Sequence, residues 1–144
     1  MRLAACLLIL LATPALAEGE TIRSLQTGDQ GRGWEAVGRI ELGDRGFCTG
    51  SLIADDLVLT AAHCLYDKET GLPLEARSFR FLAGWRNGRA EAYRNVTKAV
   101  AHPLYAYEPG EDLANVGSDL ALLQLDQPIL LPQVVPFATD GAAV

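Results

Sequence analysis

The chain has 144 residues, of which 49% are hydrophobic and 7% aromatic. Its length suits one globular domain, or one and a half small ones. The formal charge is −6 at pH 7, and an acidic surface argues against nucleic acid or an anionic membrane as a partner.

The first 17 residues are predicted to be a secretory signal peptide. Arg2 precedes an apolar run over 3–12, and the small-residue sequence Ala-Leu-Ala follows at 15–17; this order is typical of an export signal. The apolar run is shorter than the roughly 18 residues that a membrane-spanning helix needs, so we expect no membrane anchor. Cleavage after residue 17 would leave 18 acidic and 11 basic residues, a formal charge of −7. We therefore expect a secreted or periplasmic protein.

Two cysteines, Cys48 and Cys64, remain after removal of the signal peptide. In an exported chain they are most simply one disulfide, since oxidising compartments favour the bond. The closed loop of about 15 residues would stabilise the fold by about 3 kcal/mol in the chain-entropy model. The alternative is a metal site in which His63 and His102 join the cysteines, but adjacent His63 and Cys64 are poorly spaced for zinc. We expect no metal and no cofactor.

The elements expected first along the chain are an arm and three short strands. Residues 18–33 are rich in glycine and polar residues and are expected to form a leader or propeptide arm. Strands over 35–42 and 47–54 are predicted to form a hairpin around a turn at 43–46, followed by a strand over 57–60. A single helical turn over 61–65 then places His63 just past a strand end.

The rest of the chain is also predicted to alternate short strands with loops. We expect loops at 66–76 and 103–118 and strands at 78–83, 90–101 and 119–125. Beyond residue 126 the apolar residues have no clear period and resemble a linker. Trp34, Trp85 and Tyr93 are interpreted as packing residues. Short strands with almost no helical period indicate an all-β barrel or sandwich.

His63 and Asp119 are the candidate catalytic residues. Hydrolysis by a serine needs a base for the hydroxyl proton and a carboxylate that orients this base. Histidine suits the base because its ordinary pKa of about 6.5 lies near working pH. Asp119 precedes an apolar run, where a partly desolvated carboxylate needs a partner. Taken singly, each residue is more simply explained as a turn, core or capping residue.

Three segments in order make the catalytic interpretation specific. They are Phe-Cys-Thr-Gly-Ser-Leu-Ile at 47–53, Thr-Ala-Ala-His-Cys at 60–64 and Asp-Leu-Ala-Leu-Leu at 119–123. Over about 34–137 the chain resembles the N-terminal barrel of trypsin-like (chymotrypsin-fold) serine peptidases, with a context closer to bacterial secreted members. The resemblance implies a six-stranded antiparallel Greek-key β-barrel, the first of two. It also implies pairing of Cys48 with Cys64, catalytic roles for His63 and Asp119, a structural role for His102, and a polypeptide substrate.

The sequence departs from the family pattern in two ways. The Gly-Asp-Ser-Gly-Gly motif that carries the nucleophile is absent from the 144 residues, and Ser51, Ser78 and Ser118 are not in a comparable context. An activated Ile-Val-Gly-Gly-type N-terminus is also absent, since the superficially similar Arg39-Ile40 lies inside a predicted strand.

These departures leave two hypotheses for the function. The first is a secreted serine endopeptidase whose serine-bearing barrel, the obligate packing partner, is missing from this sequence. The alternative is a catalytically inactive secreted binding or scaffold protein built on a single barrel. The expected layout is a signal peptide at 1–17, an arm at 18–33, the barrel at 34–137 and the start of an inter-barrel linker at 138–144.

Overall fold

A computed structural model describes residues 27–108 and 113–140 of the chain. The predicted signal peptide and most of the predicted arm lie outside the described residues. The described part contains six β-strands: β1 (Val37–Leu42), β2 (Phe47–Ala54), β3 (Leu57–Thr60), β4 (Phe79–Ala83), β5 (Ala92–Ala101) and β6 (Ala121–Leu125).

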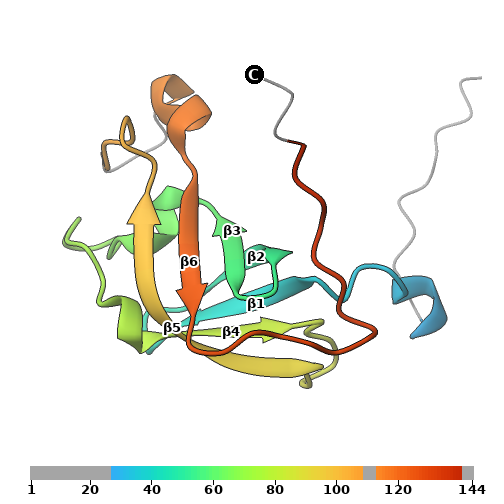
Figure 1. The fold of residues 1–144 in the computed structure, drawn as a ribbon. Coiled ribbons are helices and arrows are strands. Elements are labelled where there is room, and N and C mark those ends of the chain that lie inside the picture. The colour runs from blue at the N-terminus through green and yellow to red at the C-terminus, as the bar shows by residue number, and fades with distance from the viewer. Residues whose placement is uncertain (1–26, 109–112, 141–144) are drawn as a thin grey trace, which may run out of the picture.

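The strands close into a barrel in the order β1-β2-β3-β6-β5-β4, with β4 returning to β1 (Figure 1). Every neighbouring pair is antiparallel. The run β4-β1-β2-β3 is the spatial order of a Greek key, in which the fourth strand lies beside the first. The structure thus confirms the predicted six-stranded antiparallel Greek-key barrel.

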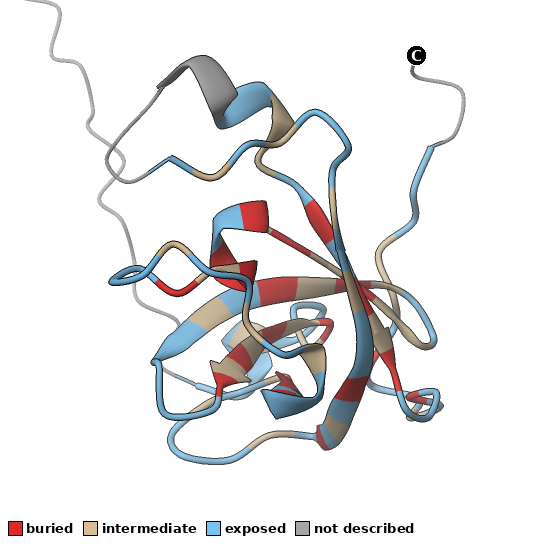
Figure 2. Cartoon of the chain, turned by 90° about the vertical axis from the view of Figure 1, so that its left-hand side faces the viewer, coloured by how far each residue is buried: buried red, intermediate tan, exposed pale blue. Residues whose placement is uncertain are grey.

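The barrel core is formed by alternate residues of each strand, as the two-residue period of a strand requires (Figure 2). In β1 the inward positions are Gly38, Ile40 and Leu42, and the residues between them are half-buried. The largest core side chains with almost no exposed surface are Phe79, Phe81, Ile40, Leu52, Leu123, Ile129, Val58, Val96 and Val134.

Gly38 and Gly50 face the barrel interior at positions where the neighbouring strands leave no room for a side chain. A Cβ on Gly38 would lie 2.4 Å from the carbonyl oxygen of Leu82, and one on Gly50 would lie 2.7 Å from Cγ1 of Val58. At each position a methyl group would therefore displace a neighbouring strand or core side chain.

The short helices are all of the 3-10 type. They are η1 (Asp29–Gly31), η2 (Ala62–Leu65), η3 (Ala76–Ser78) and η4 (Leu113–Ser118). The helical turn predicted at 61–65 is confirmed by η2. Within the described residues, no helix has the length and apolar character that crossing a membrane requires.

Four strands begin one or two residues later than the sequence predicted. The observed starts are Val37, Phe79, Ala92 and Ala121 instead of residues 35, 78, 90 and 119. Two of the leading residues form other hydrogen bonds. The Ser78 hydroxyl donates to the Glu75 carbonyl at 2.7 Å in η3, and the Ala90 amide donates to the Tyr93 hydroxyl at 3.0 Å.

A tight turn joins β4 to β5 just before residue 90. Arg86 and Arg89 exchange backbone hydrogen bonds of 2.7 and 2.9 Å, and the two residues between them, Asn87 and Gly88, have φ angles of 49° and 82°. Two consecutive positive φ angles at Asn-Gly are the mark of a type I′ hairpin turn. This turn explains why the predicted strand 90–101 started too early.

The segment after β6, whose sequence resembles a linker, packs against the barrel. Ile129 and Val134 are buried, with 1% and 2% of their surface exposed. The amides of Ile129 and Phe137 donate to the carbonyls of Asp55 and Leu52 at 2.7 and 2.9 Å. Apolar residues without a regular period can be buried by an extended segment, which a search for helical or strand periods misses.

The loop between η2 and η3 is organised around the buried carboxylate of Asp67, which is 6% exposed. One oxygen accepts hydrogen bonds from the amides of Glu69 and Thr70, both at 2.9 Å. The other oxygen pairs with the guanidinium of Arg45 in the β1–β2 turn. The Thr70 amide lowers the pKa of Asp67 most; burial opposes this, while the Glu69 amide, the Thr70 hydroxyl and Arg45 lower it further.

The first prediction concerns Gly38. We expect Gly38→Ala to lower the free energy of unfolding by about 1–3 kcal/mol, because the added methyl overpacks the contact between β1 and β4. Urea unfolding measures the change. The matched control is Gly28→Ala, where an added Cβ meets nothing within 4 Å. Equal stability of the two variants would contradict the proposed steric role.

The second prediction concerns the pH dependence due to Asp67. A lowered pKa in the folded state means that the ionised group stabilises the fold above its ordinary pKa of about 3.9, and that the contribution disappears as pH falls through the folded value. The stability difference between the wild type and Asp67→Asn should therefore be largest at neutral pH and shrink in acid. Thermal unfolding from pH 7 to pH 2.5 measures it.

The control for Asp67 is Asp44→Asn, which removes a carboxylate that also lies near Arg45 but is 95% exposed. Solvent screens such a pair, so its removal should leave the stability almost unchanged at every pH. A difference for Asp67→Asn that stays constant with pH would show that its carboxylate is not what stabilises the loop.

Candidate active site

His63 is held outward by a turn whose other residues are buried. β3 ends at Thr60, whose hydroxyl donates to the Thr49 carbonyl at 2.9 Å. The turn η2 follows, and three of its four residues, Ala62, Cys64 and Leu65, are buried. His63 is the remaining one, and its side chain is 47% exposed. The apolar residues thus fix the turn, and the imidazole is left accessible from outside the barrel.

The disulfide between Cys48 and Cys64 ties the start of β2 to this turn, with the two Cα atoms 6.3 Å apart. The structure confirms the predicted disulfide. The possible ligand atoms of Cys48, His63 and Cys64 lie within 4.8 Å of one another. Metal binding by cysteine requires thiolates, so the two bonded sulfurs do not fit the metal site weighed from the sequence.

Asp119 lies between η4 and β6, and both of its carboxylate oxygens accept hydrogen bonds from His63. The backbone amide of His63 donates to Oδ1 at 2.8 Å, and the ring nitrogen Nδ1 lies 2.7 Å from Oδ2. The two contacts join residues 56 positions apart in the sequence. They fix both the position of the histidine backbone and the rotation of its ring.

The electrostatics of Asp119 favour its ionised form. Burial of the carboxylate opposes ionisation, but the hydrogen bonds from the ring and backbone of His63 outweigh it and lower the pKa of Asp119. An ionised carboxylate can only accept, so Nδ1 of His63 carries the proton in this assignment. The other ring nitrogen, Nε2, is then left with a lone pair, as a general base requires.

A cluster of three tyrosines stands beside this pair. The rings of Tyr66 and Tyr107 stack with centroids 4.9 Å apart, and Tyr105 contacts Tyr66 at 5.9 Å. Burial and the nearby charge of Asp119 raise the pKa of Tyr105. The phenol of Tyr105 therefore stays neutral around pH 7.

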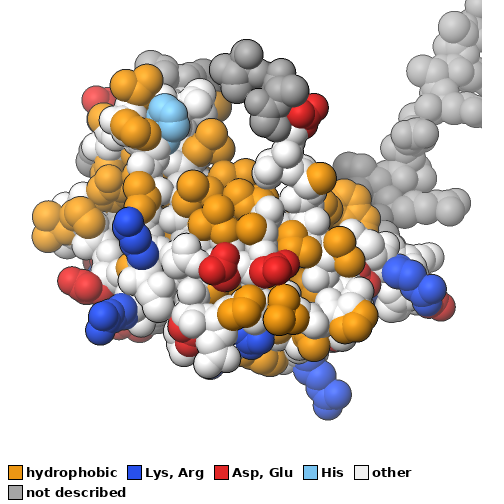
Figure 3. All heavy atoms as spheres, in the orientation of Figure 1, with side chains coloured by type: hydrophobic (Ala, Val, Ile, Leu, Met, Phe, Trp, Pro, Cys, Tyr) orange, Lys and Arg blue, Asp and Glu red, His pale blue; other side chains and the backbone are white. Residues whose placement is uncertain are grey.

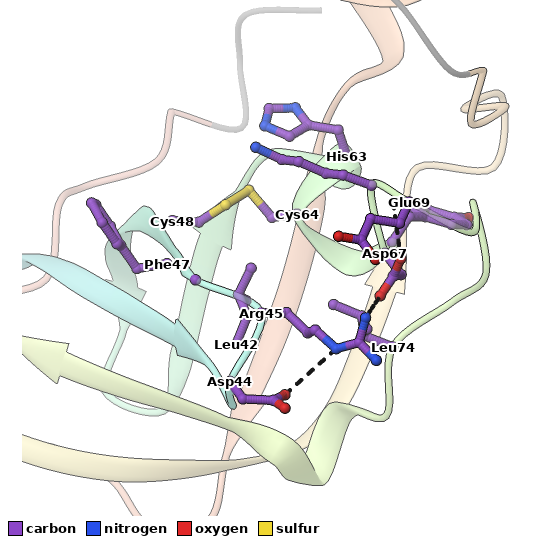
Figure 4. Close-up of a pocket in the computed structure, with 13 residues that line it drawn as sticks. Leu42, Asp44, Arg45, Phe47, Cys48, His63, Cys64, Asp67, Glu69 and Leu74 are labelled. Atoms are coloured by element: carbon purple, nitrogen blue, oxygen red, sulfur yellow. Dashed lines mark hydrogen bonds and ion pairs between the residues drawn. A yellow bond between two sulfur atoms is a disulfide. The ribbon is translucent and has the colours of Figure 1, made fainter.

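A groove of about 560 Å³ begins at the His63 ring and passes the disulfide (Figure 4). The ion pair between Arg45 and Asp67 lies toward the other end of the groove. The loop between η2 and η3, which carries Asp67, therefore forms one wall of the groove. We call this feature the His63 groove, and it is lined by Leu42, Asp44, Arg45, Gly46, Phe47, Cys48, His63, Cys64, Tyr66, Asp67, Lys68, Glu69 and Leu74.

The structure brings together the four residues singled out from the sequence: His63, Asp119 and the two bonded cysteines. His102 does not join this group. Its Nδ1 accepts a hydrogen bond from the Leu104 amide at 3.3 Å in the turn after β5, which is a structural contact. Sequence reasoning missed the tyrosine cluster and the pair of Arg45 and Asp67. A weak signal existed for Asp67, because an aspartate followed by polar residues and a glycine is typical of a side chain that caps a turn.

The arrangement can act as a general base, but none of the three serines in the described part of the chain is placed to act as its nucleophile. Ser51 is half-buried in β2, and the hydroxyl of Ser78 is donated to a backbone carbonyl in η3. Ser118 directly precedes Asp119, on the carboxylate side of the pair.

The comparisons with known proteins agree with the geometry. The family model described as Trypsin matches residues 25–143. The chain is 40% identical over 96 residues to "Modular serine protease" of Drosophila melanogaster, a match that covers 61% of this chain and 14% of that protein. It is 36% identical over 92 residues to human "Chymotrypsin-like elastase family member 1", with 61% and 31% covered.

A third relative is "Trypsin" of the beetle Phaedon cochleariae, 31% identical over 90 residues, with 62% of this chain and 31% of the relative covered. The chain therefore spans less than a third of the length of these relatives. The closer resemblance to bacterial members stays a prediction, since these three relatives are animal proteins. The matched family model, the barrel and the paired histidine and aspartate together show that this chain belongs to the trypsin family of serine peptidases.

Proposed function

We propose that the protein is an exported serine-type endopeptidase in which His63 is the general base and Asp119 its orienting partner. The observation that carries the proposal is the double hydrogen bond from His63 to the two oxygens of Asp119. This contact fixes the tautomer in which Nε2 can accept a proton, and it stabilises the imidazolium that then forms.

The proposed mechanism assigns one proton to each step. Nε2 of His63 takes the hydroxyl proton of a serine as its oxygen attacks the peptide carbonyl, and the bond to the leaving amine breaks as His63 returns the proton to the nitrogen. Water repeats the sequence to release the acyl group. The serine would come from a part of the protein outside these 144 residues, which contain no Gly-Asp-Ser-Gly-Gly motif.

An apolar outer face on the barrel supports a second barrel as packing partner. On β3 and β6, Leu59 lies directly opposite Leu122, and Val100 of β5 lies opposite Leu122 on the other side. Leu122 and Val100 are 40% and 48% exposed, and the nearby Leu120 is 46% exposed. Hydrophobic side chains gather near the centre of this face (Figure 3). A contiguous apolar patch of this kind is typical of an interface.

Export is supported by two features of the chain. The order of basic, apolar and small residues over 1–17 is typical of a signal peptide, and the disulfide between Cys48 and Cys64 is of the kind that persists in oxidising compartments. A polypeptide substrate fits the His63 groove, which is open and lined by both charged and apolar side chains.

The alternative function is an inactive exported scaffold built on a single barrel, and the closure of the six described strands on themselves favours it. A scaffold would need no cover for its outer face. It would therefore remain a monomer and bind little hydrophobic dye, whereas half of a two-barrel enzyme would associate through Leu59, Leu122 and their neighbours.

The third prediction is that Asp119→Asn lowers turnover by about 10⁴-fold, the loss known for this substitution in serine peptidases, because the amide holds the wrong histidine tautomer. The protein expressed from its complete gene is assayed with a peptide substrate. The matched control is Asp126→Asn at the other end of β6, whose carboxylate also accepts two hydrogen bonds from one residue, Asn95. Unchanged turnover in Asp119→Asn would contradict the assigned role.

The fourth prediction concerns the native protein. A serine-reactive fluorophosphonate should add once to a secreted species that contains the 57–64 peptide and is much heavier than 15.4 kDa. Intact mass measured before and after labelling gives both quantities. A species of the mature chain's length without an adduct would show that His63 and Asp119 no longer catalyse, and would favour the scaffold.

A further inference from the structure

A second small cluster of side chains lies on the outside of the barrel, over β1 and β4. Leu82 is 1% exposed, yet it points outward, because its neighbours Phe81 and Ala83 belong to the interior core. It lies opposite Arg39 of β1 and Tyr93 of β5. Side chains on the outer surface must therefore cover Leu82, and Arg39 is one of those directly opposite it.

Arg39 is held by two aromatic rings. Its guanidinium carbon lies 3.9 Å from the ring centroid of Phe47 and 5.6 Å from that of Trp85. Both rings remain accessible, with 62% of Phe47 and 37% of Trp85 exposed. Arginine flanked by aromatic residues is the composition of strong binding sites on protein surfaces.

Within the described residues, the buried Nε of the Arg39 guanidinium donates no hydrogen bond. The neighbouring carboxylate of Glu41 accepts from Nε and Nη2 of Arg80 at 3.1 and 2.7 Å. Its other oxygen is 3.9 Å from Nε of Arg39, beyond hydrogen-bond distance. Among the described residues, the buried Nε of Arg39 has no hydrogen-bond partner.

A guanidinium that is largely buried and has an unused donor favours an anionic ligand. The side chain of Arg39 is 29% exposed, so most of it has lost its contact with water, and a guanidinium carries five donors in a planar fork. A carboxylate matches the two outer nitrogens of this fork, and the flanking rings exclude water from the contact. Lysine would supply the charge without the fork.

The position of Phe47 identifies the source of the carboxylate. Phe47 lines the His63 groove (Figure 4), and its ring centroid also lies 3.9 Å from the guanidinium carbon of Arg39. A polypeptide that leaves the groove past Phe47 therefore reaches Arg39 and Trp85 next. We infer that Arg39, between Phe47 and Trp85, binds an aspartate or glutamate side chain of an extended polypeptide substrate, at a distance from the bond that is cleaved. The inference rests on the proposed function for its substrate class.

Binding to a peptide tests the inference without any need for catalysis. The probe is an acetylated and amidated peptide with four consecutive glutamates, and the same peptide with glutamines is the comparison. The protein is expressed from its complete gene, and binding at low salt is followed by isothermal titration calorimetry, which needs no reporter residue.

The expected result is a saturable change with the glutamate peptide that Arg39→Gln weakens by about tenfold or more, as loss of a charged hydrogen-bonded pair predicts. Arg39→Lys should recover part of the affinity. The charge-matched control is Lys98→Gln on β5, whose register partner Gln124 belongs to β6 and not to β1. Its affinity should stay within about twofold of the parent protein.

Three results would overturn the inference: equal binding by Arg39→Gln and the parent protein, equal binding of the glutamine peptide, or equal binding of inorganic phosphate, which would indicate a general anion site. Failure of the proposed function is separable. It would appear as no turnover of a short uncharged reporter peptide by the parent protein, whatever the binding result at Arg39.

Discussion

The active-site geometry depends on the antiparallel pairing of β3 with β6. Thr60, the last residue of β3, lies opposite Ala121, the first residue of β6. The chain that follows β3 and the chain that precedes β6 therefore emerge at the same end of the barrel, and this brings His63 to Asp119. The hydrogen bonds between them are a result of strand register, because a shift of one strand by one residue would turn its side chains to the opposite face.

The other parts of the site secure this register. The disulfide fixes the turn that carries His63 to β2. Tyr66, which follows this turn, contacts both Tyr105 and Tyr107 of the loop that precedes η4. The segment after β6 returns across the barrel and hydrogen-bonds to Leu52 and Asp55. Together these contacts hold the base and its partner on rigid elements, the condition under which a small number of catalytic groups is effective.

Much of this structure could be predicted from the sequence because its signals are local. Alternating burial, the turn at residues 43–46 and the motifs around His63 and Asp119 each lie within a few neighbouring residues, and all six strands were predicted to within two residues. The missed features are long-range. Arg45 meets Asp67 across 22 positions, and Tyr66 meets Tyr107 only because two loops converge. No periodicity marks such contacts, since they depend on tertiary packing.

Closure of the barrel between β1 and β4 also determines how this chain can associate. In the described fold every strand has a hydrogen-bonded neighbour on each side, so no strand edge is open to pairing with another chain. Association of the folded barrel must then proceed through side chains on its outer surface. Contact driven by apolar burial has no directional backbone bonds and is strengthened by excluded salts such as sulfate. Clustering of the folded chain would thus be reversible and amorphous, and fibres would require the barrel to open first.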